Sequence, residues 1–320
     1  MRVPVRLGLQ LPSFELGVAP EALFAKLVEI AETAGSSGFD SVFVMDHLHQ
    51  IPGVGPPEHR MLEGNTTLAA LAARTERVQL GLMVGSVTYR NPALHAKITT
   101  TLDVVSGGRA IHSLGAGWYE EEHRAYGYEF PPLKERFERL EDALRISRAM
   151  FTQESATVEG RHHHVEEVLV NPRPLRGDIP ILVGGSGERK TLRLVAQYAD
   201  GCNVFGDPER ARHLMGVLDA HCEDVGRDPA EITRTRLGTL AIAGTHEEAE
   251  QQLAAWPDRL KIDPERLKHV VTVGAPDEVG ERIQVLVDAG IEGFVFNMPN
   301  PQDPDALALA GETVSRALAD

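Results

Sequence analysis

Cysteine, aromatic residues and long apolar runs are all scarce in this chain of 320 residues. Its two cysteines, Cys202 and Cys222, are too few for a disulfide framework, and no paired Cys/His spacing indicates a zinc site. No apolar run approaches the roughly 18 residues of a membrane span. The first β-branched run begins too near Met1 to leave room for a signal peptide. We therefore expect a cytoplasmic protein without a metal site.

Positive charge is also in short supply. Lys and Arg number 32 against 47 Asp and Glu, which gives a net charge of -15. Nucleic acid and anionic membrane surfaces repel such a chain unless a local basic patch intervenes, so neither is an expected partner. The hydrophobic share of 42% and the charged share of 25% are ordinary for a soluble globular protein. The expected partner is a small molecule.

What the chain does have is a regular alternation of short β-branched runs and longer segments of helical period. This alternation predicts a parallel sheet with crossover helices. Strands are expected at 5–11, 39–45, 78–84, 110–114, 179–183, 201–205, 233–243 and 293–297. Helices are expected at about 21–36, 66–75, 92–105, 133–151, 208–225 and 247–260. Another helix is expected to follow the turn at 184–187 and to end at 198, and the last helix is expected at 276–289.

Eight strands in alternation predict an α/β fold, a (β/α)8 TIM barrel, formed by residues 1–320 as a single domain. A doubly wound sheet is the rival fold, but it usually has fewer strands and a nucleotide fingerprint after the first one, which this chain lacks at 10–13. The pattern lapses at about 152–178, where we expect an inserted hairpin and loop lying over the strand ends. A helical excursion is expected at about 244–270.

The second expected strand stops abruptly at Asp46-His47. The imidazole of His47 is suited to donate or accept a proton near neutral pH. The alternative is that Asp46 caps the next element and His47 is an ordinary hydrogen-bonded residue. A barrel favours the first interpretation, because polar residues at the carboxyl ends of its strands usually belong to the active site.

A glycine-rich turn, Gly184-Gly185-Ser186-Gly187, follows the fifth expected strand and precedes a helix. Glycines allow backbone amides to converge, Ser186 adds a hydroxyl, and a helix N-terminus favours negative charge, so a phosphate is the expected ligand. The spacing fits neither a Walker loop nor a dinucleotide fingerprint. A plain βα turn without a ligand is the open alternative.

Three other polar runs are interpreted as structural. The three histidines at 162–164 cannot converge on one metal ion, because consecutive strand residues alternate faces, so we expect a solvated hairpin. The run Glu-Glu-Glu-His at 120–123 is expected to be an exposed helix start. His112 falls in mid-strand and is expected to be a hydrogen-bonded core residue.

Six stretches of the chain carry a pattern that is weak in each piece but specific in order and spacing. They are Gly38 to Leu48, Leu71 to Gly81, Tyr89 to Leu94, Thr101 to Arg109, Leu114 to Trp118 and Pro180 to Gly187. On these the chain resembles the luciferase-like monooxygenase superfamily, and within it the branch that uses the deazaflavin coenzyme F420. The resemblance covers nearly the whole length.

The resemblance implies a barrel with the insertion after strand four near the active site, and hydride transfer between F420 and a small organic substrate. It implies that His47 lies at the cofactor ring beside the substrate, and that the turn at 184–187 holds the cofactor phosphate. It places Met83 and Val84 at a bulge behind the ring, often with a non-prolyl cis peptide. It also implies close backbone approach at Gly115 and Ala116, and a homodimer.

Two departures separate the chain from the sugar-phosphate and alcohol dehydrogenases of that branch. Those enzymes carry a tryptophan shortly after the histidine and an acid after the fourth-strand glycines, where this chain has Ile51 and Trp118. Their substrates are therefore not implied. Two alternatives stay open: a monooxygenase that uses reduced FMN and oxygen on the same scaffold, and a cofactor-binding protein without turnover.

Overall fold

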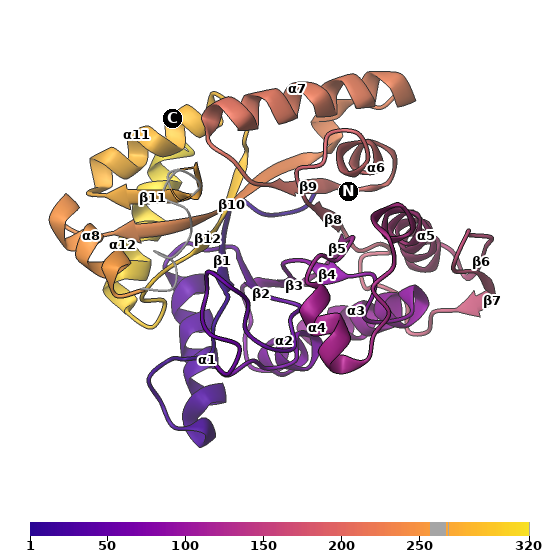
Figure 1. The fold of residues 1–320 in the computed structure, drawn as a ribbon, viewed down its shortest axis with the longest axis horizontal. Helices are drawn as coiled ribbons and strands as arrows, with labels where there is room; N and C mark the ends of the chain where they lie inside the picture. The colour runs from indigo at the N-terminus through magenta and orange to yellow at the C-terminus, as the bar shows by residue number, and fades with distance from the viewer. Residues whose placement is uncertain (257–266, 268, 320) are drawn as a thin grey trace.

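Eight parallel strands close into a barrel in the computed structural model, which describes residues 1–256, 267 and 269–319 (Figure 1). The ring runs in the order β12, β1, β2, β3, β5, β8, β9, β10, and β10 pairs with β12 to close it. The prediction of a (β/α)8 TIM barrel is confirmed, and each of its strands overlaps a range expected from the sequence, with β5 and β8 each ending one residue later than expected. The barrel strands are β1 (Leu7–Leu11), β2 (Ser41–Val44), β3 (Gln79–Leu82), β5 (Ala110–Gly115), β8 (Ile181–Gly184), β9 (Gly201–Val204), β10 (Thr233–Ile242) and β12 (Gly293–Asn297).

The strands bury both of their faces, which is why they read as apolar runs in the sequence. Side chains alternate along each strand, so in β2 Val42 and Val44 pack with the surrounding helices while Phe43 belongs to a separate cluster inside the barrel. That inner cluster also contains Val3, Val5, Met83, Ile111, Leu182 and Val295. The barrel is therefore a filled core whose two ends are the surfaces left for ligands.

Helices surround the barrel, and the local sequence marks most of their ends. Proline occupies the first turn of α1, α3, α7, α11 and α12, where its missing N–H has no helical partner to lose. In α3 the Asn91 side chain also accepts bonds from two backbone amides, and Gly107 ends the helix with φ 72°. The helices are α1 (Pro20–Ser36), α2 (Gly64–Ala72), α3 (Pro92–Ser106), α4 (Glu120–Tyr126), α5 (Leu133–Thr152), α6 (Thr191–Tyr198), α7 (Pro208–Val225), α8 (His246–Ala254), α11 (Pro276–Val287) and α12 (Pro304–Ala317).

The prediction that the chain's last helix lies at 276–289 is wrong, since α12 follows β12 and packs against α1 and α11. Its start could have been found, because Asp303-Pro304 repeats the cap signal of Asp207-Pro208 at the start of α7. The expected helical excursion at 244–270 contains α8, and its residues 257–266 and 268 lie outside the described part of the chain. A short strand, β11 (Val271–Gly274), then pairs with the second half of β10.

The stretch at 152–178 contains an antiparallel hairpin, β6 (Ser155–Val158) with β7 (Val165–Leu169). Figure 1 shows the hairpin beside α5 at the outer edge of the molecule. Leu175 and Arg176, near the end of this stretch, bond to Asp103 and Gly108, beside the turn that leads into the start of β5. The expectation that the stretch lies over the carboxyl ends of the strands is therefore wrong for this part of it. The helix α5 starts at the carboxyl ends of the barrel strands and runs back along the barrel. A segment that follows α5 therefore starts at the amino ends of the strands. The division of the chain into one domain with these inserts stays a prediction.

Candidate active site

A cavity of about 670 Å³ opens at the carboxyl ends of the barrel strands. That volume lies within the range of sites for cofactors and small ligands, and this end of a barrel is where active sites are built. The cavity brings together most residues predicted from the sequence: Asp46, His47, Met83, Val84, Gly115, Ala116, Gly184 and Gly185. Ser86, Tyr89, Trp118, Leu133, Phe137, Thr191 and Phe205 also line it.

The floor of the cavity is built around Val84. The peptide between Met83 and Val84 is cis, as the resemblance implies for this bulge. A Cβ added at Gly115 would lie 2.7 Å from a Val84 methyl group, and one at Gly184 would lie 2.8 Å from two of its methyl carbons. These two glycines therefore make room for the Val84 side chain, which a larger residue would push into the cavity.

His47 is held by Glu122 at the edge of the cavity. Its Nδ1 lies 2.9 Å from Oε2 of Glu122, and its side chain is 13% exposed, whereas that of Glu122 is fully buried. A carboxylate accepts but does not donate, so it holds the proton on Nδ1 and leaves Nε2 of His47 as the nitrogen able to exchange a proton with a ligand. The structure thus supplies an orienting partner for the histidine.

Four donors converge on Glu122 and keep it ionised. The Tyr89 hydroxyl and the Leu48 amide donate to it, and the His49 amide does so at 3.1 Å, in addition to His47. Burial alone raises the pKa of Glu122, but the hydrogen bonds from His47, Tyr89 and the Leu48 amide outweigh it and lower the pKa to about 2. Burial and the neighbouring carboxylate raise the pKa of Tyr89, so it remains a donor.

The interpretation of 120–123 as an exposed helix start is half wrong. A short helix, α4, does start at Glu120, but Glu122 and His123 are buried. The side chain of His123 bonds to the Thr88 hydroxyl at 2.6 Å and to the Tyr119 carbonyl at 2.7 Å. The sequence could not distinguish Glu122 from its two acidic neighbours, because only the docking of α4 decides which one faces inward.

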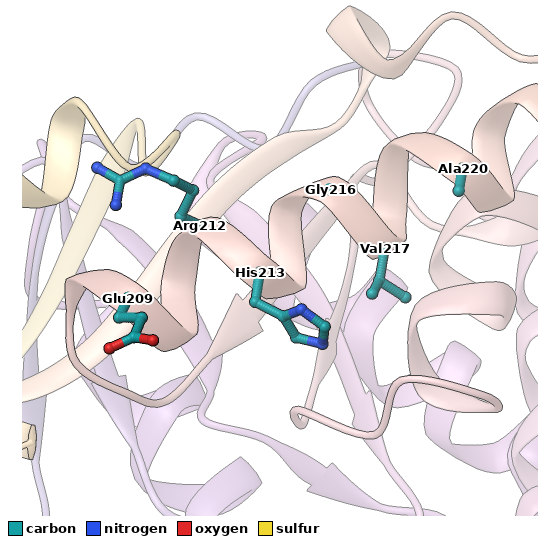
Figure 2. A pocket seen from close by; sticks show the side chains of 6 residues that line it. All are labelled: Glu209, Arg212, His213, Gly216, Val217 and Ala220. Atoms are coloured by element: carbon teal, nitrogen blue, oxygen red, sulfur yellow. The ribbon is translucent and has the colours of Figure 1, made fainter.

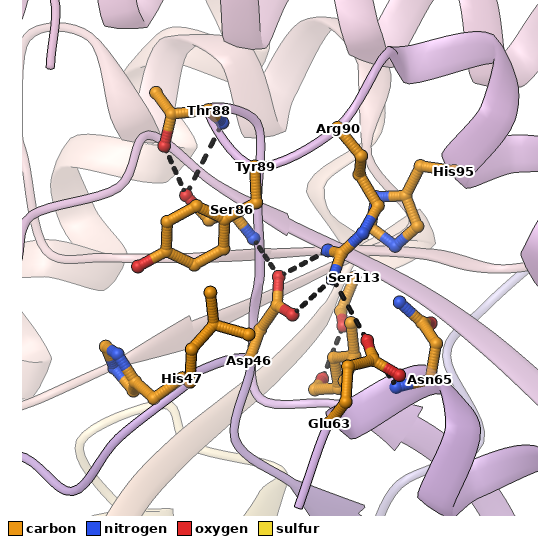
Figure 3. Close-up of polar contacts among 12 residues, drawn as sticks. Asp46, His47, Glu63, Asn65, Ser86, Thr88, Tyr89, Arg90, His95 and Ser113 are labelled. Atoms are coloured by element: carbon orange, nitrogen blue, oxygen red, sulfur yellow. Dashed lines mark hydrogen bonds and ion pairs between the residues drawn. The ribbon is translucent and has the colours of Figure 1, made fainter. Parts of the chain in front are cut away.

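Asp46 is engaged by structural partners (Figure 3). Arg90 donates to both of its oxygens, at 2.7 and 2.8 Å, and the Ser86 amide donates to Oδ2 at 2.7 Å. Arg90 also reaches Glu63 at 3.3 Å. A bidentate pair of this kind ties the end of β2 to the segment after β3. Tyr89 and Arg90 lie in the loop that follows β3 and the two-residue strand β4 (Gly85–Ser86), so the strand-end reasoning applied to Asp46-His47 could have found them as well.

The four residues of the glycine-rich turn at 184–187 have two different roles. Gly184 and Gly185 line the cavity together with Thr191, the first residue of α6, whereas Ser186 and Gly187 do not. The Ser186 hydroxyl accepts a bond from the Phe205 amide at 2.9 Å and so joins the loops after β8 and β9. Thr191 was missed from the sequence, although it stands at the helix start that the phosphate hypothesis requires.

Two buried acceptors on the cavity floor lack a donor. Gln10 donates its amide to the Met83 carbonyl at 3.3 Å, which fixes its orientation and leaves Oε1 without a partner among the described residues. Oδ1 of Asn297 likewise has none, and the register pairs it with Gln10 on the adjacent strand. Unsatisfied buried oxygens at a cavity fit a ligand ring that carries N–H groups.

Exposed apolar side chains surround the mouth of the cavity. The Trp118 ring is edge-on to His47, with ring centroids 5.6 Å apart, and stacks on Tyr119 at 5.0 Å. Although Trp118, Leu133 and Phe205 line the cavity, they are 58%, 57% and 45% exposed. Apolar surface left open at a cavity mouth indicates a ligand surface.

The remaining histidines have structural surroundings. His112 bonds to Thr99 at 2.8 Å and to Ser147 at 2.9 Å, and burial lowers its pKa, which confirms a hydrogen-bonded core residue. The three histidines at 162–164 lie in the β6–β7 turn, where backbone amides bond to Asp142. Within the described ranges, no three His, Cys, Asp or Glu side chains lie close enough to share a metal ion.

A second hollow lies on the outer face of α7 (Figure 2). One helix supplies all six of its lining residues, namely Glu209, Arg212, His213, Gly216, Val217 and Ala220. Glu188, from the loop before α6, already pairs with His213 at 3.3 Å, and the other five residues lie along the same helix, so the hollow does not assemble a site.

Comparison with known proteins identifies the family. A family model described as luciferase-like monooxygenase matches residues 6–293. The chain belongs to the luciferase-like monooxygenase family. The F420-dependent glucose-6-phosphate dehydrogenase of Microbacterium testaceum (strain StLB037) is 29% identical, with 98% of this chain and 97% of that protein covered. The enzyme of the same name from Nakamurella multipartita (strain ATCC 700099 / DSM 44233 / CIP 104796 / JCM 9543 / NBRC 105858 / Y-104) is 30% identical, with 97% and 96% covered.

A solved structure agrees with the fold of this luciferase-like chain. The F420-dependent secondary alcohol dehydrogenase in complex with an F420-acetone adduct superposes with a TM-score of 0.82 at 20% identity, and all of both chains is covered. The family predicted from the sequence is therefore confirmed. In the described part of the chain, no helix is long and apolar enough to cross a membrane.

Proposed function

We propose that this protein is an F420-dependent oxidoreductase that moves a hydride between the deazaflavin and a small organic substrate. The observation that carries the proposal is the strand-end cavity, whose lining includes His47 and two buried side-chain oxygens, on Gln10 and Asn297, that have no donor among the described residues. The names of the curated relatives, which match over almost the whole chain, favour F420 over FMN. A cytoplasmic homodimer stays a prediction.

The residues present fit the cofactor. Val84, Gly115 and Gly184 offer an apolar floor for a ring, and the acceptors on Gln10 and Asn297 suit its N–H groups. Gly184, Gly185 and Thr191 at the start of α6 offer backbone and hydroxyl donors for a phosphate. When bound, the deazaflavin supplies a ring carbon that gives or takes a hydride.

The protein's own part in the reaction is to position groups and to handle a proton. Glu122 keeps the proton on Nδ1 of His47, so Nε2 takes or gives the proton that accompanies the hydride. Asp46, with its oxygens occupied by Arg90 and the Ser86 amide, is a positioning residue and not the acid or base. Placing a proton-transfer group in this way contributes about 10²- to 10⁴-fold to a rate.

Titration with the two cofactors tests the proposal. Oxidised F420 and FMN are added separately to the apoprotein, and the fluorescence of each cofactor is followed. We expect F420 to bind at micromolar concentrations and FMN more weakly. If neither binds, the floor and phosphate assignments fail together. If reduced FMN supports oxygen-dependent product formation and F420 does not, the protein is a flavin monooxygenase.

A binding protein without turnover is separated by His47→Ala. For an enzyme, we expect this variant to bind F420 nearly as well as the natural protein but to lose about 100-fold or more in turnover. Unchanged binding with no turnover by either protein, over a broad substrate panel, would favour the noncatalytic role. Ser36→Ala, on the exposed C-terminal turn of α1, is the matched control, with both properties unchanged.

A further inference from the structure

We infer that the substrate is a planar, uncharged, conjugated ring compound that stacks on Trp118 beside His47, and not a phosphorylated sugar. This inference rests on the proposed function, since it concerns lining residues of the same cavity that the cofactor assignment does not use. It concerns the outer wall, formed by Pro12, Ile51, Val54, Trp118, Leu133 and Phe137.

All six residues of the outer wall have apolar side chains. Ile51 and Val54 come from the loop after β2, Trp118 from the segment after β5, and Leu133 and Phe137 from the first turns of α5. Trp256 donates its indole N–H to the Val54 carbonyl at 2.8 Å and so ties that loop to the end of α8. With Pro12, which follows β1, four separate segments thus contribute apolar side chains to the outer wall.

Trp118 is the side chain that selects a flat ligand. Its indole is 58% exposed although it lines a cavity, so a large aromatic face is left for a ring to cover. Tyr119 stacks behind it and fixes its orientation. With the His47 ring centroid 5.6 Å away, a ring on Trp118 reaches the nitrogen that exchanges protons.

Charge in the cavity opposes a phosphorylated sugar. Asp46, His47 and Tyr89 are the titratable side chains among the described lining residues, and no lysine or arginine is among them. Arg90 is already committed to Asp46 and Glu63. A phosphate dianion on this wall would lose its hydration without a described counter-ion, and sugar hydroxyls would face apolar side chains.

Calorimetry on the protein loaded with oxidised F420 tests the inference without turnover. The probes are 2,3-dimethyl-1,4-naphthoquinone, which is planar, 1-decalone, which is a saturated bicycle, and glucose 6-phosphate. We expect the naphthoquinone to bind at least tenfold more tightly than the other two. Trp118→Ala weakens that binding about tenfold, Trp118→Phe keeps it within about threefold, and Leu169→Ala, an exposed apolar residue on the hairpin, leaves it unchanged.

Three results would overturn the inference: 1-decalone binding as tightly as the quinone, Trp118→Ala binding the quinone normally, or glucose 6-phosphate reducing the bound F420. F420 fluorescence is measured in every sample, so failure of the proposed function is separate. If F420 does not bind, the function is wrong, and quinone binding to the apoprotein and its loss in Trp118→Ala still decide the nature of the wall.

Discussion

The two sides of the cavity are built from different groups. On the side of β2 and β5, buried charged side chains hold one another: Glu122 holds His47, and Arg90 holds Asp46. On the side of β8 and α6, glycines and backbone atoms form the surface, and the Ser186 hydroxyl turns away to bond to the Phe205 main chain. The carboxylate of Glu122 fixes which ring nitrogen of His47 carries the proton, whereas glycine residues without side chains allow a ligand to approach the backbone closely.

Substitutions on the two sides of the cavity should therefore affect different properties of the protein. A substitution in the charged network leaves a buried charge unpaired and affects folding or proton transfer. A substitution on the glycine side alters the shape of the cavity, and so affects cofactor affinity more than stability or proton transfer.

Arg90→Met should cause the largest loss of stability. It leaves the buried Asp46 carboxylate without its bidentate partner, and breaking a buried pair in this way costs about 3–5 kcal/mol. Urea unfolding followed by circular dichroism measures the loss. The double variant Asp46→Asn with Arg90→Met should recover part of it, because no unpaired charge remains. Equal losses in the single and double variants would contradict the idea that the pair acts as a unit.

Glu122→Gln should reduce turnover by about 10- to 100-fold while F420 affinity stays within about twofold, because the amide no longer holds His47 as a carboxylate does. It also changes the pH dependence of stability. The pKa of Glu122 is lowered from 4.5 to about 2, so its stabilising effect is present above pH 4.5 and is lost as the pH falls toward 2.

The difference in unfolding free energy between the natural protein and Glu122→Gln should therefore shrink by up to about 3 kcal/mol between pH 5 and pH 2. Unfolding at a series of pH values measures it. Glu121→Gln, an exposed neighbour on the same helix, is the control and should show no such slope. A slope of the same size in the control would mean that general charge, and not the buried site, is responsible.

Gly184→Ala should weaken F420 binding about tenfold, or ~1.4 kcal/mol, with a smaller effect on turnover of the bound enzyme. Its new Cβ would lie 2.8 Å from two Val84 methyl carbons and push that side chain into the cavity. Adding Val84→Ala should restore most of the affinity, because the displaced methyl groups are gone. Fluorescence titration decides, and failure of the second change to restore binding would show that Val84 is not the cause.

Ser186→Ala should have the smallest effect, less than about threefold in F420 affinity, because its hydroxyl already bonds to the Phe205 main chain and does not line the cavity. Thr191→Val, which removes a hydroxyl that does line the cavity, should weaken binding more. The same titration compares the two variants. If Ser186→Ala weakened F420 binding more than Thr191→Val, Ser186 would belong to the phosphate site, as expected from the sequence.

Much of the fold could be predicted because its signals are local. Short β-branched runs marked the barrel strands, segments of helical period marked most helices, and Pro92, Pro208 and Pro276 marked helix starts. The helix α12 was missed although Asp303-Pro304 announced it. The place expected for the stretch at 152–178 was wrong in its last part, because no local pattern tells which end of the barrel a segment reaches.

The site divides in the same way. The end of β2 identified Asp46 and His47, since an abrupt change from apolar to polar residues is visible along the chain. Glu122 could not be found, because three glutamates in a row carry the same local signal. Burial of one of them depends on the contact of α4 with a strand end 75 residues earlier in the chain.

The eight alternating strands, the barrel and the strand-end position of His47 follow from local patterns, because each depends on the spacing of apolar residues along the chain. The carboxylate that orients His47, the glycines that accommodate Val84 and the wall that contains Trp118 follow from the folded arrangement. Those assignments depend on distances between segments far apart in the chain, and local periodicity contains no information about them.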